Sequence, residues 1–107
     1  MSDQHDRIFR SLADPTRRAI LERLCLDGEQ NVLSLTEQAG ISQPAVSKHL
    51  AVLKQAGLVS GRQDGRQTRY SANIQGLAPL VDWTRTMSRF WDVKLDGLED
   101  ILKRMDQ

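Results

Sequence analysis

With 107 residues the chain has the length of one small domain, and its formal net charge of +1 neither indicates nor excludes a nucleic-acid partner. Hydrophobic residues at 39% and charged residues at 27% exclude a disordered chain, and no apolar run approaches the roughly 18 residues of a membrane span. The polar residues 1–6 are not expected to form a secretory signal, and a single cysteine, Cys25, allows no internal disulfide, so we expect a cytoplasmic protein with no membrane partner.

The first 26 residues predict two short helices. The first helix, over residues 4–13, places Ile8 and Leu12 on one face. Asp14 can cap the second helix and Pro15 suits its first turn, while a glycine shortly afterwards ends it.

A helix-turn-helix is predicted over residues 34–56. Ser34 and Glu37 have the spacing of a capping box, in which the hydroxyl and the carboxylate satisfy amides of the first helical turn. After this short helix and a glycine turn, Ser42 caps a second helix that ends at Gly57. Two short helices joined around a glycine are typical of helix-turn-helix geometry.

The second of these helices has two different faces. Val46, Leu50 and Leu53 form the inward face. The outward face carries no acidic residue, and residues 42–71 as a whole contain five lysines and arginines against one aspartate. Glutamine can bond a base edge and lysine can reach a phosphate or guanine, although the helix taken alone also fits an ordinary solvent-exposed face. The candidate DNA contacts on this helix are Gln43, Pro44, Ser47, Lys48 and Lys54.

A basic hairpin is predicted over residues 58–72, directly after the helix-turn-helix. Two strand-like runs flank an Asp-Gly pair at 64–65, and glycine supplies the positive φ of a tight turn. This hairpin would form the wing of a winged helix. We expect Arg62, Arg66 and Arg69 to contact phosphates or the minor groove, with Arg66 reaching furthest, while Arg69 could equally pair with an acid of the fold.

A long C-terminal helix is predicted over residues 76–106. Apolar residues recur every seven positions, which is typical of a helix that pairs with a second helix; Trp83 and Trp91 also fit a ligand pocket. Gly97 leaves the continuity of the helix open. The predicted dimer residues on this helix are Leu80, Met87, Trp91, Leu98 and Ile101.

Together these elements predict a mainly α chain with a small β-hairpin. We expect one winged helix-turn-helix domain over residues 1–107, with about five helices, a two-stranded wing and a dimeric state.

Three motifs resemble the ArsR-type winged-helix repressors: ADPTRRAIL at 13–21, ISQPAVSKHL at 41–50 and LKQAGLV at 53–59. The resemblance implies a homodimer held by its first and last helices, so Ile8 and Leu12 of the first helix join the predicted dimer interface. It further implies that the homodimer binds an inverted-repeat operator in double-stranded DNA through its fourth helix. It also implies that Gln43, Pro44, Ser47 and Lys48 face the groove.

Metal sensing is common among such repressors, and the resemblance places a thiol site at Asn31, Val32 and Leu33, where no cysteine stands. Residues 72–107 contain no histidine, and carboxylates alone suit zinc poorly. We therefore expect a member without the metal-binding motifs, with no metal site and no cofactor, while an unidentified small-molecule effector stays open.

Cys25 is expected to be a small buried residue, with an intersubunit disulfide as the alternative. His49 is expected to pack or to bond the backbone.

We do not expect an enzyme, because the sequence contains neither a glycine loop that could cradle a phosphate nor a nucleophile with a neighbouring base. The alternative to a DNA-binding repressor is a winged-helix interaction module whose basic face binds an acidic protein.

Overall fold

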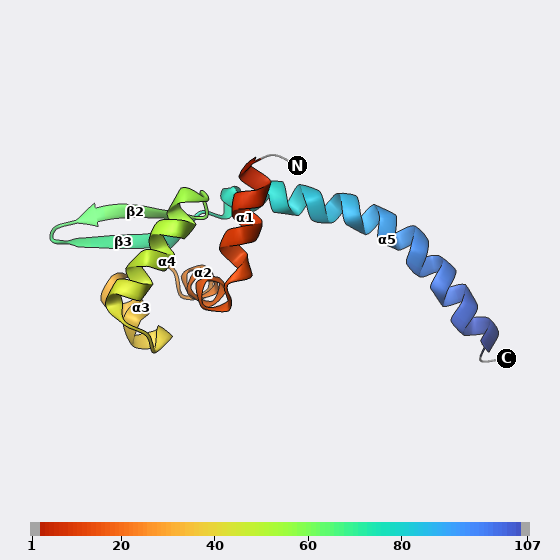
Figure 1. Ribbon diagram of the computed structural model, residues 1–107, viewed down its shortest axis with the longest axis horizontal. Coiled ribbons are helices and arrows are strands. Elements are labelled where there is room, and N and C mark those ends of the chain that lie inside the picture. Colours follow the sequence, from red (N-terminus) through yellow and green to blue (C-terminus); the bar gives the residue numbers. More distant parts are fainter. Residues whose placement is uncertain (1–2, 106–107) are drawn as a thin grey trace.

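The computed structural model describes residues 3–105, and for residues 92–96 it describes the backbone alone. Asp106, the last residue of the predicted C-terminal helix, lies outside the described residues, as do Met1 and Ser2. In chain order the elements are α1 (Asp3–Ala13), α2 (Pro15–Asp27), β1 (Gln30–Asn31), α3 (Val32–Ala39), α4 (Gln43–Gln55), β2 (Val59–Asp64), β3 (Gln67–Ala72), the 3-10 helix η1 (Ile74–Leu77) and α5 (Ala78–Met105). The predicted fold class is confirmed (Figure 1). Among the described helices, none combines the length and the apolar character that a membrane span needs.

The core lies where α1, α2, α3 and α4 meet the base of the wing (Figure 1). Helix α2 begins as predicted, because the Asp14 carboxylate accepts a hydrogen bond from the Arg17 amide at 3.1 Å. Helix α4 likewise begins at its predicted cap, Ser42. Aliphatic side chains from each element close the core: Ile8, Ile20, Leu21, Leu24, Leu35, Val46, Leu50, Leu53, Leu58 and Val59.

The predicted cap of α3 is wrong. The helix begins at Val32, and its N-cap is Asn31, whose Oδ1 accepts from the Ser34 amide at 2.9 Å. Ser34 therefore lies inside the first turn, where its hydroxyl donates to Gln30 Oε1 at 3.0 Å.

The predicted two-stranded wing is the hairpin of β2 and β3, and the strand β1, which the sequence did not predict, extends it to a three-stranded antiparallel sheet with the order β1-β3-β2. The short strand β1 pairs with the base of the hairpin, Gln30 opposite Tyr70. The turn also differs by one residue: Asp64 pairs with Gln67, which leaves Gly65 and Arg66 at the tip. Gly65 adopts a φ of 62°, a conformation that glycine reaches at little cost.

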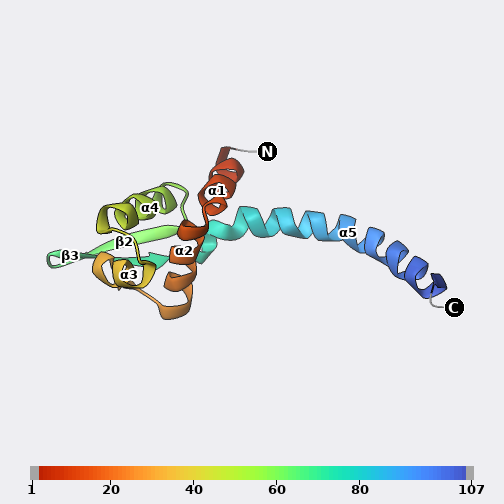
Figure 2. The same cartoon turned by 60° about the horizontal axis from the view of Figure 1, so that its bottom comes forward.

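Helix α5 extends well beyond the other elements and gives the whole molecule a longest dimension of 66 Å (Figures 1 and 2). It passes through Gly97 without interruption, which settles the continuity that the sequence left open. Near its start it packs on α1, where the rings of Phe9 and Trp83 meet edge to face with centroids 5.2 Å apart. Its departure point is fixed by a close backbone approach, since a Cβ on Gly76 would lie 1.9 Å from the carbonyl oxygen of Gly57.

Candidate nucleic-acid interface

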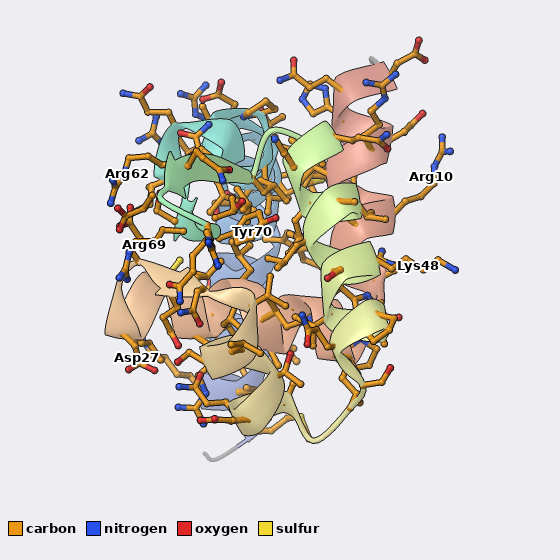
Figure 3. The ribbon with its side chains drawn as sticks, turned by 90° about the vertical axis from the view of Figure 1, so that its left-hand side faces the viewer. Arg10, Asp27, Lys48, Arg62, Arg69 and Tyr70 are labelled. Atoms are coloured by element: carbon orange, nitrogen blue, oxygen red, sulfur yellow. The ribbon has the colours of Figure 1, made fainter. Side chains whose placement is uncertain are left out.

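Helix α4 presents its predicted outward face to solvent. The side chains of Val46, Leu50 and Leu53 are almost completely buried, and this fixes the rotation of the helix about its axis. The opposite face is exposed and carries the predicted residues Gln43, Pro44, Ser47, Lys48 and Lys54. In Figure 3, Lys48 extends away from the body of the molecule. No ion pair within the described part of the chain involves either lysine, so both charges are available to an anionic partner.

The start of α4 and the tip of the wing come together. Gln43 and Arg66 both line a hollow of about 250 Å³, with Asn31, Thr68 and Tyr70 among its other walls. Arg66 is exposed and belongs to no ion pair among the described residues. The fold therefore places Gln43, whose amide can hydrogen-bond base edges, in the same hollow as Arg66, whose charge can contact phosphates or a DNA groove.

Arg62 and Arg69 are placed differently. In Figure 3 both lie on the opposite side of the molecule from Lys48. Arg62 donates to Glu29 at 2.6 Å, and Arg69 donates to Asp64 at 2.8 Å. The hydrogen bond from Arg69 lowers the pKa of the Asp64 carboxyl, and that from Arg62 to Glu29 raises the pKa of Arg62. The ion pair with Asp64 is one of the two kinds of contact that the sequence allowed for Arg69.

Arg17 is a positioning residue that the sequence analysis did not identify. Its Nε donates to Nδ1 of His49 on α4 at 3.3 Å, and its Nη1 donates to the carbonyl oxygen of Ser11 at 3.2 Å and to that of Arg10 at 3.4 Å. One guanidinium thus joins the end of α1 and the start of α2 to the middle of α4. His49, predicted to pack or to bond the backbone, is half-buried, and its Nδ1 accepts from a side chain and not from the backbone.

Cys25 is exposed, so the prediction of a buried thiol is wrong. The inward face of α2 is formed by its neighbours Leu21 and Leu24, and Cys25 follows outside that face. The thiol lies in an apolar groove of about 420 Å³ between α1, α2 and the start of α5, together with Leu26, Leu77 and others. Across the residues whose side chains are described, no three histidine, cysteine or acidic side chains gather as a metal site.

The predicted dimer residues fall into three groups. Ile8 is only 1% exposed and packs in the core of its own chain, so it has no surface to offer a partner. Leu12, Leu80 and Met87 are half-buried, the first two as walls of the apolar groove. Further along α5, large apolar side chains are exposed to solvent, including Trp91 (55%), Leu98 (49%) and Ile101 (51%).

Comparisons with known proteins agree on one kind of protein. Residues 14–60 match the sequence pattern described as "Bacterial regulatory protein, arsR family". The chain is 44% identical over 98 residues to the HTH-type transcriptional regulator Rv2034 of Mycobacterium tuberculosis, covering 91% of this chain and 87% of that protein. It is 45% identical over 86 residues to the probable mercury resistance operon repressor of Streptomyces lividans, covering 80% and 68%.

Solved structures share the fold. The crystal structure of the ArsR family transcriptional regulator RHA00566 superposes with a TM-score of 0.75 at 29% identity, covering 84% of this chain and 92% of that one. The solution structure of Mb0332 from Mycobacterium bovis, described as a homodimeric winged helix-turn-helix DNA-binding domain, gives a TM-score of 0.66 at 29% identity and covers 81% and 80%.

Proposed function

The chain belongs to the arsR family of bacterial regulatory proteins, which are DNA-binding transcriptional regulators and not enzymes, and from this we propose that it represses transcription from an inverted-repeat operator that it binds as a homodimer. The observation that carries the proposal is the hollow shared by Gln43 of α4 and Arg66 of the wing. Because the bacterial chromosome lies in the cytoplasm, we propose that the protein acts there.

In the proposed complex α4 enters the major groove and the wing tip reaches the neighbouring minor groove or its phosphates. Arg62 and Arg69 contribute little, because each already donates to a carboxylate and both lie away from Lys48 (Figure 3). The proposed contacts are therefore Gln43, Pro44, Ser47, Lys48 and Lys54 from α4 and Arg66 from the wing.

The homodimer is proposed to form along α5. Exposed apolar side chains on a helix that leaves the body of the protein favour burial against a second copy, and the Mb0332 structure is described as homodimeric. The groove between Leu12 and Leu80 continues this surface toward α1. In this proposal residues 34–56 and 58–72 read DNA, while residues 76–106 pair the protomers. The proposed interface keeps Leu12, Leu80, Met87, Trp91, Leu98 and Ile101 and omits Ile8.

Operator binding is proposed to be indifferent to metal ions. The position that resembles the thiol site holds Asn31, whose side chain is already engaged: Oδ1 accepts from the Ser34 amide and Nδ2 donates to Gln67 at 3.1 Å. Release would then depend on a non-metal effector or on the amount of repressor.

The experiment is binding of chelator-treated protein to the DNA upstream of its own gene, in the presence of competitor DNA, with and without zinc. The proposal expects saturable binding to a palindromic site with equal affinity in both conditions. Release by zinc would show that the protein responds to a metal. Binding no tighter than to competitor DNA would favour the interaction module with an acidic protein partner.

A further inference from the structure

A third cavity lies where α1, α2 and α4 meet, apart from the hollow shared by Gln43 and Arg66 and from the apolar groove beside Cys25. It has a volume of about 420 Å³ and is lined by Arg7, Arg10, Ser11, Arg17, Val52, Gln55 and Ala56. Three of these seven residues are arginines and none is an acid. Neither of the functions discussed above uses this pocket.

The three arginines differ from others in the protein. Arg23, Arg62, Arg69 and Arg85 each face a carboxylate within 4.0 Å, whereas no ion pair among the described residues involves the pocket arginines. Asp14 is close to Arg17 in the chain, but it does not line the pocket and its carboxylate accepts from the Arg17 backbone amide. Among the described residues no carboxylate lies within 4.0 Å of these three guanidinium groups, although the charges of Asp14 and Arg17 do interact. The pocket therefore gathers three cations without a directly paired acid.

Arg17 is held in place before any ligand arrives. Its Nε and Nη1 donate to His49 and to two carbonyl oxygens of α1, so the guanidinium has little freedom left to lose on binding. Arg7 and Arg10 are exposed on α1, and Figure 3 shows Arg10 extending outward on the same side of the molecule as Lys48. A fixed cation at the wall with two mobile cations at the rim suits an anion with several oxygens.

From this arrangement we propose that the pocket between α1, α2 and α4 binds a small free oxyanion with two or more negative charges, a phosphate ester or a polycarboxylate. Its volume lies within the range of small-molecule sites. The amide of Gln55 and the hydroxyl of Ser11 add neutral polar groups to the wall that recognise oxygen atoms.

The depth of the pocket favours a free molecule over a phosphate of the DNA backbone. Its walls include Ser11 and Ala56, which are only 3% and 6% exposed, so the pocket reaches the layer of buried residues. A small free anion can enter a pocket of this volume and contact these walls, whereas a duplex would meet the molecule mainly at its protruding side chains. A ligand here would contact both α1 and α4, the helix proposed above to read DNA.

The test is calorimetric titration of the full chain, without DNA, with pyrophosphate and with citrate at constant ionic strength set by sodium chloride. We expect saturable binding that weakens at least tenfold in the double variant Arg7→Gln/Arg10→Gln. The matched control is Arg89→Gln, which removes an exposed arginine of α5 outside the pocket and should leave the affinity unchanged. Arg17 is left intact because its bonds support the fold.

Two results would overturn the proposal. One is that neither probe shows saturable binding, and the other is that the pocket variant binds as tightly as the wild type. If neither probe binds and the salt dependence of DNA binding is shallower in Arg7→Gln/Arg10→Gln, these arginines belong to the DNA interface instead. Because the titration contains no DNA, its result does not depend on whether the chain is a repressor.

Discussion

Arg62 and Arg69 stand directly opposite each other as register partners of the two wing strands, and each donates to a different carboxylate. Like charges facing one another across a sheet are unfavourable, and Glu29 and Asp64 offset that repulsion. Both cations are thus engaged before DNA arrives. Arg66, at the tip of the same hairpin, has no carboxylate partner among the described residues.

Replacing Arg66 should therefore weaken operator binding more than replacing Arg62. For Arg66→Ala we expect about a 10-fold loss of affinity and a salt dependence shallower by about one unit of slope, because one phosphate or groove contact is lost. For Arg62→Ala we expect less than about a 3-fold loss, since the charge removed is already paired. Fluorescence anisotropy over a series of salt concentrations measures both. Equal losses in the two variants would mean that DNA displaces Glu29 from Arg62.

Arg17 and Arg18 are adjacent, yet they should contribute differently to stability. Arg17→Ala removes bonds to His49 and to two carbonyl oxygens, while Arg18→Ala removes one exposed bond to the carbonyl oxygen of Leu12. We expect the free energy of unfolding to fall by about 1–3 kcal/mol in the first variant and by less than about 1 kcal/mol in the second. Urea denaturation at a fixed protein concentration distinguishes them, and a larger effect of Arg18→Ala would contradict the positioning role of Arg17.

Two glycine-to-alanine changes should act in opposite directions. A Cβ at position 76 would lie 1.9 Å from a backbone oxygen, so Gly76→Ala must displace the start of α5, and we expect a loss of at least about 2 kcal/mol in the free energy of unfolding. Gly97 lies inside α5, and a Cβ there would have no atom within 4 Å. Because alanine favours the helix over glycine, Gly97→Ala should raise the free energy of unfolding by about 0.5–1 kcal/mol. Thermal unfolding of both variants provides the comparison. A neutral Gly76→Ala would show that the contact with Gly57 relaxes easily.

Trp91→Glu should convert the protein to monomers. The side chain is 55% exposed in the protomer, so its loss leaves the core intact while placing a charge in the proposed apolar interface. Operator binding should fall with dimerisation, because the two half-sites must be engaged together. Arg89→Glu, at another exposed position of α5, is the matched control. Sedimentation velocity that leaves Trp91→Glu with the wild-type profile would exclude this part of α5 from the interface.

The cap of α2 should make stability depend on pH in the acid range. The Arg17 amide donates to the Asp14 carboxylate and, with the charges of His49 and Arg17 adding to it, holds the pKa of that carboxyl below its ordinary value of 3.8. Since the folded state lowers this pKa, the stabilisation is fully present above 3.8 and is lost as the pH falls through the lower, folded value. Asp14→Asn should therefore lower the unfolding temperature at pH 7, and the gap to wild type should close below pH 3.8. A gap that stays constant down to pH 3 would contradict this origin.

Local signals predicted most of the fold. Asp14 and Ser42 are caps whose partner amides lie three residues away, and the alternation of buried and exposed residues along α4 follows from its own sequence. The strand β1 gave no such signal, because two residues have no periodicity and its pairing partner, Tyr70, is 40 residues distant. Asn31, the last residue of this strand, is also the residue that caps α3 in place of the predicted Ser34.

The candidate site also has a part that could be predicted from the sequence and a part that could not. The outward face of α4 could be predicted from helical geometry, but the faces of the wing could not, because they depend on the register of the hairpin and on its tilt against the body. The acid that engages Arg62 is 33 residues away, and the contact between Arg17 and His49 spans 32 residues. Charge counting treats all such arginines alike, whereas the fold separates engaged cations from available ones.

In the proposed homodimer, we expect the length of α5 to link the lifetime of the protein to its abundance. A helix far from the core owes most of its stability to packing, so at dilutions that separate the protomers its outer turns lose the partner surface and fray. Frayed apolar segments are good protease substrates. For the proposed repressor, we therefore expect each halving of the concentration by cell growth to accelerate the degradation of the remaining protein, so that repression ends abruptly once synthesis stops.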